Sequence, residues 1–334
     1  MFKNKTILVT GGTGSFGQKF AETCLNKLNV KKIIIYSRDE LKQFEMSNKF
    51  SKKKNFNKLR FFIGDVRDYS RLFTAMENVD IVVHAAALKQ VTTAEYNPLE
   101  AIKTNVYGAQ NVIESSLNRK VKNIIALSTD KAAAPINLYG ATKLTSDKLF
   151  LSANNVRGSK NTKFSVVRYG NVMFSRGSVI PFFLEQKKTG FIPITDKEMT
   201  RFNITLAEGV NFVLKCFKNM IGGELFVPKI PSIKIIDLAN VIAPNLPQKI
   251  IGIRPGEKIH EEMITETDSL NTYEFKDYYV ILSDYGYSLE KNQMQKYIIS
   301  KGGKKCKRGF NYNSKNNIKF LKKSEIKKLI SKFK

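Results

Sequence analysis

The residues most suited to chemistry are a tyrosine and a lysine four positions apart, Tyr139 and Lys143. On a helix, residues at this spacing lie on one face, so the phenol and the ammonium are neighbours. A nearby positive charge favours the phenolate and lowers a pKa that is about 10 when unperturbed. We therefore predict that Tyr139 takes a proton from a sugar hydroxyl while a nicotinamide takes the hydride.

A second acid–base pair, Asp130 and Lys131, comes shortly before this tyrosine. Hydride transfer alone needs no further acid and base, so the pair favours elimination of water from the substrate. Lys131 could act as a base only as the free amine, a form that burial or the nearby Lys143 would promote. Asp130, in its protonated form, would donate to the leaving hydroxyl.

A glycine motif near the start of the chain, Gly11-x-x-Gly14-x-x-Gly17, predicts a dinucleotide site. It lies between an apolar run at 6–10 and a helical pattern at about 15–28. Glycines let a pyrophosphate approach backbone N–H groups at the N-terminus of a helix. The preceding strand and the following helix make this motif more specific than a lone glycine pattern.

The end of the second expected strand, at 32–36, bears on which dinucleotide binds. NAD sites usually place a carboxylate there, but this chain continues with Ser37 and Arg38. A guanidinium suits a 2′-phosphate, which favours NADP, although Asp39 follows directly and could instead bind the ribose. Later strands are expected to add Asp65 and Val66 at the adenine, and the small residues Ala85, Ala86 and Ala87 beside the cofactor.

Short apolar segments alternate with helical segments through the first half of the chain. This alternation predicts an α/β fold with a doubly wound parallel sheet, a Rossmann fold. Beyond about residue 170 glycine and proline become frequent. We therefore expect an NADP-binding domain over 1–170 and a smaller substrate domain over 171–334, with 204–228 as a candidate for return to the first domain. The expected strands are 6–10, 32–36, 60–63, 81–84, 123–127 and 164–168.

Composition narrows the class of protein. The chain has 334 residues, of which 42% are hydrophobic, as is typical of a folded soluble protein. It has no apolar run of about 18 residues that would span a membrane. The first strand begins almost at once, so we expect no signal peptide and a cytoplasmic location. The three cysteines are scattered and there are two histidines, so we expect no metal site.

The net charge of +27 has two interpretations. Residues 301–334 carry thirteen Lys and Arg against one Glu, which is the pattern of a tail that binds nucleic acid or another polyanion. The alternative is a lysine-rich composition on solvated faces, with attraction for an anionic substrate. We favour the second interpretation, because the lysines lack the interleaved aromatic residues of a base-stacking surface.

Six stretches taken together carry a family resemblance: 10–17, 36–42, 94–98, 128–143, 168–172 and 252–258. In them the chain resembles the extended short-chain dehydrogenase/reductase family. More closely, it resembles the configuration-inverting UDP-N-acetylglucosamine 4,6-dehydratases that begin pseudaminic acid synthesis. The similarity runs from about residue 5 to 290 and weakens in the basic tail.

The resemblance implies an NADP-dependent lyase of glycan biosynthesis that acts on a UDP-sugar as a homo-oligomer, from a dimer to a hexamer. Its product would be UDP-2-acetamido-2,6-dideoxy-β-L-arabino-hex-4-ulose, formed by oxidation at C4, loss of water across C5 and C6, and hydride return to C6. The implied catalytic residues are Thr129, Asp130, Lys131, Tyr139 and Lys143. Tyr139 and Lys143 also belong to the cofactor set, to which the resemblance adds Thr13, Ser15, Phe16, Ser37 and Lys42. The implied substrate residues are Lys89, Asn171, Arg201, Arg254 and Glu257.

Five positions around the substrate depart from the family pattern. Gln90 and Thr92 replace His and Pro, Ala134 replaces Asn, and Asn203 replaces Trp. Phe174 replaces a Gly and would add a ring where backbone approaches the ligand. The preferred UDP-hexose therefore stays open.

Two alternatives remain beside the dehydratase. A UDP-sugar 4-epimerase uses the same tyrosine and lysine but never reacts at C5 or C6, and the presence of Asp130 and Lys131 argues against it. The more distant alternative is an NADP-binding protein whose basic tail binds a polyanion.

Overall fold

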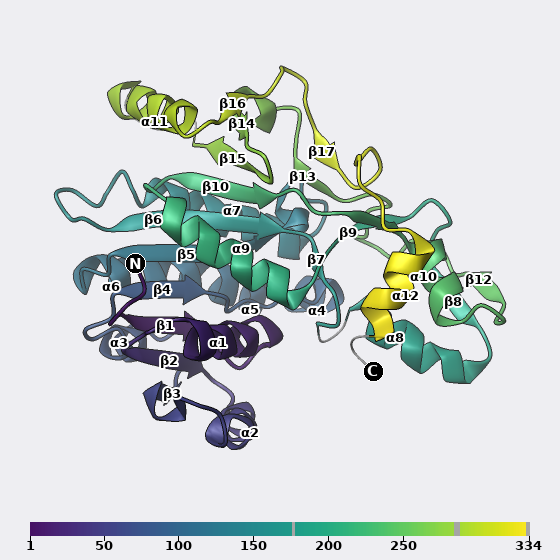
Figure 1. Cartoon of the computed structure of the whole chain (residues 1–334), viewed down its shortest axis with the longest axis horizontal. Helices are drawn as coiled ribbons and strands as arrows, with labels where there is room; N and C mark the ends of the chain where they lie inside the picture. The colour runs from purple at the N-terminus through teal and green to yellow at the C-terminus, as the bar shows by residue number, and fades with distance from the viewer. Residues whose placement is uncertain (176–177, 284–287, 332–334) are drawn as a thin grey trace.

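A computed structural model describes residues 1–175, 178–283 and 288–331 (Figure 1). Its centre is a ten-stranded sheet with the order β16-β14-β15-β10-β6-β5-β4-β1-β2-β3. From β10 to β3 all neighbouring strands are parallel, whereas β14, β15 and β16 pair antiparallel. The strands are β1 (Thr6–Thr10), β2 (Lys32–Ser37), β3 (Leu59–Ile63), β4 (Ile81–His84), β5 (Asn123–Thr129), β6 (Lys163–Tyr169), β10 (Glu224–Pro228), β14 (Thr272–Glu274), β15 (Tyr278–Leu282) and β16 (Lys304–Lys305).

The expected α/β doubly wound sheet is confirmed, and each of the six expected strands is present within two residues of its expected bounds. Most of their apolar residues are buried because helices cover both faces of the sheet, whereas at the edge strand β3 Phe61 and Phe62 are half-buried and Ile63 is exposed. In Figure 1, α1 and α9 lie in front of the sheet, and α6 and α7 lie behind it. The helices around the sheet are α1 (Ser15–Lys27), α2 (Glu40–Ser51), α3 (Tyr69–Ala75), α4 (Val91–Tyr96), α5 (Pro98–Ile102), α6 (Gly108–Asn118), α7 (Leu138–Ser152), α9 (Leu206–Asn219) and α11 (Ser288–Ser300).

Segment 204–228 contributes to the large sheet. Thr205 and Glu208 form a capping box that starts α9, and β10 then pairs with β6. Segment 272–305 adds three further strands to the same sheet. The division of the chain into a cofactor domain and a substrate domain stays a prediction.

A second hydrophobic cluster lies beside the carboxyl ends of the parallel strands (Figure 1). Ile326 and Ile330 of the last helix are buried in it. The lysines of this helix that the structure describes are exposed, so the basic segment folds back onto the protein. The elements here are β7 (Asn171–Val172), α8 (Val179–Gln186), β8 (Ile192–Ile194), β9 (Thr200–Ile204), β11 (Ser232–Lys234), α10 (Ile235–Ile242), β12 (Gln248–Ile250), β13 (Glu262–Ile264), β17 (Tyr312–Asn313) and α12 (Lys323–Ser331).

Candidate active site

One continuous cavity of about 1010 Å³ runs from the glycine motif to the loop at 254–261. It lies at the carboxyl ends of the parallel strands, where ligands bind in open α/β sheets. All five residues expected to bind the substrate line it. So do the residues expected to bind the cofactor, apart from Asp39 and Lys143. Among the expected catalytic residues, Thr129, Lys131 and Tyr139 line it directly.

The glycine motif forms a cradle that side chains would fill. Gly11 has φ +64°, and a Cβ atom there would lie 2.8 Å from the backbone nitrogen of Ala86. A Cβ atom on Gly17 would lie 2.4 Å from the carbonyl oxygen of Gly12. Gly14 caps α1 without a side-chain hydrogen bond, which leaves N–H groups of the first turn for an anion. These residues therefore fit the pyrophosphate of a dinucleotide.

Of the two candidates for contact with the adenosine ribose, Arg38 lines the cavity and Asp39 does not. Asp39 does not line the cavity but caps α2, where its carboxylate accepts a hydrogen bond of 2.9 Å from the backbone N–H of Lys42. It also forms an ion pair with the Lys42 ammonium. Arg38 lines the cavity with a side chain that is 54% exposed, and its Nη1 lies 3.7 Å from Asp65 Oδ2. A half-exposed guanidinium can turn toward a bound phosphate, whereas Asp39 is engaged in the cap.

Tyr139 stands in the first turn of α7, close against the turn that carries Asp130 and Lys131, the 3₁₀ turn η3 (Asp130–Ala132). Gly140 permits this approach, because a Cβ atom there would lie 2.2 Å from the Lys131 carbonyl oxygen. Burial raises the pKa of Tyr139 to about 12, although the Lys131 charge and a hydrogen bond with Thr129 oppose the rise.

The expected effect of Lys143 on this tyrosine is wrong. Lys143 is itself buried, and burial lowers its pKa, opposed in part by Asp147. The ammonium that opposes the raised pKa of Tyr139 belongs to Lys131. Burial, which the i, i+4 spacing does not reveal, outweighs the Lys131 charge.

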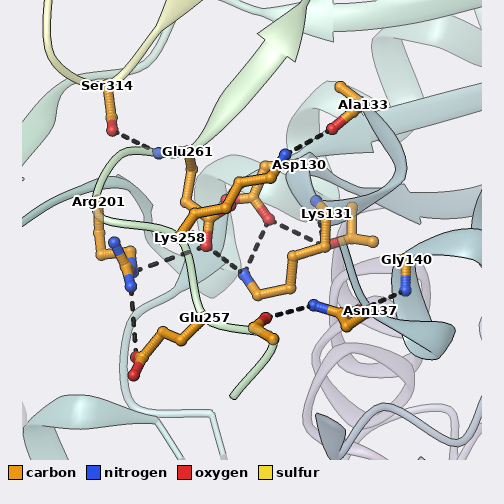
Figure 2. Close-up of polar contacts among 12 residues, drawn as sticks. Asp130, Lys131, Ala133, Asn137, Gly140, Arg201, Glu257, Lys258, Glu261 and Ser314 are labelled. Carbon is orange, nitrogen blue, oxygen red and sulfur yellow. Dashed lines mark hydrogen bonds and ion pairs between the residues drawn. The ribbon is translucent and has the colours of Figure 1, made fainter. Parts of the chain in front are cut away.

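Lys131 is held between two carboxyl groups (Figure 2). Its Nζ lies 3.1 Å from Asp130 Oδ1 and 3.0 Å from Glu261 Oε1. Burial lowers the pKa of Lys131, but attraction to Asp130 and Glu261 outweighs burial and raises the pKa. The expected effect of burial on this amine is therefore present, but the two carboxyl groups outweigh it.

Asp130 lies behind the cavity wall. It is fully buried, and one of its oxygens, Oδ2, has no hydrogen-bond partner among the described residues. Burial raises the pKa of Asp130, although the Lys131 charge opposes the rise. Its Oδ1 accepts a hydrogen bond of 2.9 Å from the Thr129 hydroxyl, so it connects to the cavity through Thr129 and Lys131.

The loop at 254–261 holds this catalytic turn from the opposite side (Figure 2). The Asn137 amide donates a hydrogen bond of 2.7 Å to the Gly256 carbonyl, and the Lys258 ammonium donates one of 2.8 Å to the Ala133 carbonyl. Residues about 120 positions apart in the chain thus form one wall, which only the folded chain brings together.

Arg201 connects this loop to β9. Its Nη1 donates to the Ile259 carbonyl at 2.9 Å, and its Nη2 lies 3.3 Å from Glu257 Oε1. Its Nε lies 3.7 Å from Glu261 Oε1. Arg254 lines the cavity from an exposed position nearby. The two arginines fit an anionic diphosphate.

Glu261 is a site residue that sequence reasoning missed. It is 1% exposed, lines the cavity and contacts both Lys131 and Arg201. The one signal in the sequence was its position three residues after the motif at 252–258. That spacing does not by itself bring it to Lys131.

The departures from the family pattern divide into two groups. Gln90, Thr92 and Asn203 line the cavity. Phe174 is not among the lining residues, and its ring packs against the second hydrophobic cluster, of which Met173, Ile180 and Phe183 line the cavity. The expected approach of this ring to the ligand stays a prediction. Phe174 and Ala134 both have positive φ, +59° and +43°, where the Gly and Asn of the family pattern are favourable.

Two kinds of site are not found. Among residues 1–175, 178–283 and 288–331, no three or more His, Cys, Asp or Glu residues gather as metal ligands would. In the same part of the chain, every helix is too short or too polar to cross a membrane.

Comparisons with known proteins place the chain beside nucleotide-sugar enzymes. The family model described as polysaccharide biosynthesis protein matches residues 7–283. A UDP-N-acetylglucosamine 4,6-dehydratase (inverting) of Campylobacter jejuni subsp. jejuni is 55% identical over 333 residues, 99% of this chain and 98% of the relative. A UDP-glucose 4-epimerase of Rickettsia conorii is 42% identical, over 99% of this chain and 96% of that protein.

Solved structures agree in fold. Pen from Bacillus thuringiensis superimposes with a TM-score of 0.88 at 39% identity, over 100% of this chain and 99% of that one. DesIV of Streptomyces venezuelae, a dTDP-glucose 4,6-dehydratase with NAD and TYD bound, has a TM-score of 0.67 at 19% identity. That match covers 76% of this chain and 86% of DesIV.

Proposed function

Because the chain belongs to the polysaccharide biosynthesis protein family, within the extended short-chain dehydrogenases/reductases, we propose that it is a C5-inverting UDP-N-acetylglucosamine 4,6-dehydratase. The observation that carries the proposal is that Tyr139, Lys131 and the buried Asp130 meet at one end of the cavity. An oxidation at C4 alone would not require Asp130 or Lys131. The inverting dehydratase at 55% identity supports the same reaction.

The proposed residue roles follow from where each group lies. Tyr139 takes the proton of the 4-hydroxyl, and a nicotinamide cofactor, when bound, would accept the hydride from C4 and supply it to C6. Lys131 removes the proton at C5, which the ketone at C4 has made acidic. Asp130 supplies a proton for the leaving 6-hydroxyl, and the Thr129 hydroxyl, which lines the cavity, donates to Asp130 Oδ1 and holds this acid in place.

The remaining residues position the substrate. Arg201 and Arg254 would bind the diphosphate, with Glu257 orienting Arg201. Lys89 and Asn171 would lie beside the sugar, since both line the same cavity as Lys131 and Tyr139. The amide of Asn203 replaces a large aromatic ring in this wall, so it leaves more room for the hexose.

Deuterium labelling tests the function. In deuterated water, a dehydratase converts UDP-N-acetylglucosamine to a product that has lost one water and carries deuterium at C5. A UDP-sugar 4-epimerase, which the relative at 42% identity keeps as the second candidate, gives an unlabelled C4 epimer. Recovery of the epimer without loss of water would refute the dehydratase proposal. A small panel of UDP-hexoses in the same assay defines the preferred sugar.

We propose NADP as the dinucleotide. Arg38 faces the cavity from the end of β2, while Asp39, the carboxylate that would suit NAD, is engaged at the start of α2. Equilibrium titration with NADP and NAD, followed by fluorescence, tests this without turnover. Tighter binding of NAD would refute it.

Three further parts of the proposal come from the family resemblance. They are a homo-oligomeric state, a cytoplasmic location and a place at the start of pseudaminic acid synthesis. Light scattering on the purified protein tests the first, and a monomer at micromolar concentration would refute it.

A further inference from the structure

We propose that Glu261 is a positioning residue that accepts the proton of Lys131 when the nucleotide sugar binds, and so provides the free amine that elimination needs. This inference rests on the proposed function and concerns a residue to which neither the motifs nor the resemblance gave a role. It also explains how Lys131, whose pKa the two neighbouring carboxyl groups raise, can act as a base.

The contact between the two groups is direct. Glu261 Oε1 lies 3.0 Å from Lys131 Nζ, which is hydrogen-bonding distance. The other oxygen, Oε2, is buried and has no hydrogen-bond partner among the described residues. Burying a charged carboxylate with an unpartnered oxygen is costly unless nearby cations compensate its charge. Its charged state therefore depends on its two cationic neighbours.

Those neighbours are Lys131 and Arg201. Burial raises the pKa of Glu261, but attraction to Lys131 and Arg201 outweighs burial and lowers the pKa. Arg201 Nε lies 3.7 Å from Glu261 Oε1, and the arginine also lines the cavity. An anion that binds Arg201 will therefore change the pKa of Glu261.

A nucleotide diphosphate is such an anion. When its oxygens approach Arg201, they neutralise the charge that favours ionised Glu261 and add negative charge nearby. Both effects raise the proton affinity of Glu261. They also raise the pKa of Lys131, which the Arg201 charge lowers. The change at Glu261 is the larger, because Arg201 contacts this carboxylate directly at 3.7 Å. In a dry site, a neutral acid beside a neutral amine also avoids the cost of two buried charges. Substrate binding thus favours transfer of one proton from Nζ to Oε1.

The proton transfer balances. An N–H bond of Lys131 breaks, its electron pair stays on nitrogen, and an O–H bond forms on Glu261. The free amine then takes the C5 proton. The electrons of that C–H bond form the C5–C6 double bond as the C6–O bond breaks, and the leaving oxygen receives the proton from Asp130. No further oxidant or reductant is needed.

The backbone of Glu261 is held in place by two hydrogen bonds with Ser314. Its N–H donates to the Ser314 hydroxyl oxygen at 2.9 Å, and its carbonyl accepts from the Ser314 N–H at 2.7 Å. Ser314 is fully buried, and its hydroxyl lies 2.7 Å from that of Thr200. The C-terminal segment therefore sets the position of the carboxylate relative to Lys131.

The test separates C4 oxidation from proton removal at C5. Glu261→Gln keeps the shape of the side chain and removes its capacity to take a proton. In single turnovers, we expect formation of reduced cofactor to stay within about threefold of wild type. Deuterium exchange at C5 should fall by about a hundredfold, the scale of a lost acid–base contribution.

The pH profile gives a second readout. Without Glu261, Lys131 must lose its proton to solvent, so C5 exchange in Glu261→Gln should rise about tenfold per pH unit below the pKa of the amine. Wild type should depend on pH less steeply. Glu257→Gln is the matched control, because Glu257 contacts Arg201 but not Lys131 in the structure. It should raise KM and leave the slope of the C5 profile unchanged.

Two results would overturn the inference. One is C5 exchange in Glu261→Gln at the wild-type rate with the wild-type pH profile. The other is an equal fall of C4 oxidation and C5 exchange, which indicates general damage to the site. If Glu261→Gln does not fold, Glu261→Asp retains the acid at a greater distance and should lose C5 exchange only in part, with the wild-type profile. Absence of water loss in wild type would instead refute the proposed function itself.

Discussion

The two halves of the cavity are built by different means. The half that fits the dinucleotide consists mainly of backbone and small residues that follow β1, β2 and β4. The half proposed for the sugar consists of charged side chains from three distant parts of the chain: the turn after β5, Arg201 in β9, and the loop at 254–261 (Figure 2). The small residues of the first half leave room for the dinucleotide, whereas the second half presents charged side chains to the sugar.

Backbone conformation shows the same contrast. In the dinucleotide half, positive φ occurs at Gly11, which has no Cβ to clash. In the sugar half it occurs at Gly256, and beside that half also at Ala134 and Phe174, where a side chain makes it unfavourable. Residues that combine positive φ with a side chain thus accompany the second half.

The largest expected effect is in the sugar half. Lys131→Ala should reduce C5 deuterium exchange by about a thousandfold or more, because the proposed base is gone. Dinucleotide affinity should stay within about twofold of wild type, since none of the lysine's ionic partners lies in the dinucleotide half. Mass spectrometry of the labelled product and a binding titration measure the two quantities. Normal product formation would remove Lys131 from the mechanism.

The next effect is in the dinucleotide half. Gly17→Ala places a Cβ atom 2.4 Å from the Gly12 carbonyl oxygen, so the loop must shift. We expect dinucleotide affinity to fall by at least about tenfold, or about 1.4 kcal/mol. The matched control is Gly209→Ala in α9, where the nearest neighbour of a Cβ atom, Ile204 Cδ1, is 4.0 Å away. This control should bind the dinucleotide normally and gain up to about 1 kcal/mol of stability. Equal affinity of the two variants would contradict the proposed cradle.

A smaller effect is expected at Arg38, where the dinucleotide half depends on a charge. Arg38→Ala should weaken NADP binding by about tenfold, the scale of a hydrogen bond to a charged group, and leave NAD binding nearly unchanged. Parallel titrations with both dinucleotides measure the ratio. A fall in both affinities by the same factor would show that Arg38 does not recognise the 2′-phosphate.

The smallest effect concerns strain. Ala134→Gly should stabilise the protein by about 0.5–1 kcal/mol, because glycine adopts φ +43° without the Cβ clash. Ala141→Gly, inside α7, should destabilise it by about 1 kcal/mol. Denaturant unfolding of both variants gives the comparison. A loss of stability in Ala134→Gly as large as in Ala141→Gly would mean that residue 134 is not strained.

Local patterns were enough to predict the dinucleotide half. The strand, the glycine spacing and the helix are consecutive in the chain, so Gly11, Gly14 and Gly17 could be read as one unit, and the structure places all three on the cavity. Arg38 was found for the same reason, at the end of the next strand. The sequence did not show that Asp39 caps α2, because an aspartate suits both a helix cap and a ribose-binding site.

The charge states of the sugar half could not be predicted in this way. Lys143 was expected to lower the pKa of Tyr139, but the depth of burial and the charge of Lys131 decide it. Burial was expected to promote the free amine of Lys131, and burial does lower its pKa, but attraction to Asp130 and to Glu261, 130 positions away, outweighs burial. Burial and long-range partners are properties of packing, and no spacing along the chain encodes them.

By itself, the sequence determined the doubly wound sheet, the dinucleotide motif and the residue types of an acid–base site, because periodicity, glycine spacing and helix faces are local. Only the tertiary structure decided that Glu261 and Arg201 surround Lys131, that Asp130 lies behind Thr129, and that the Phe174 ring packs against the second hydrophobic cluster. The physical reason is that desolvation and Coulomb attraction act between atoms close in space, whatever their separation along the chain.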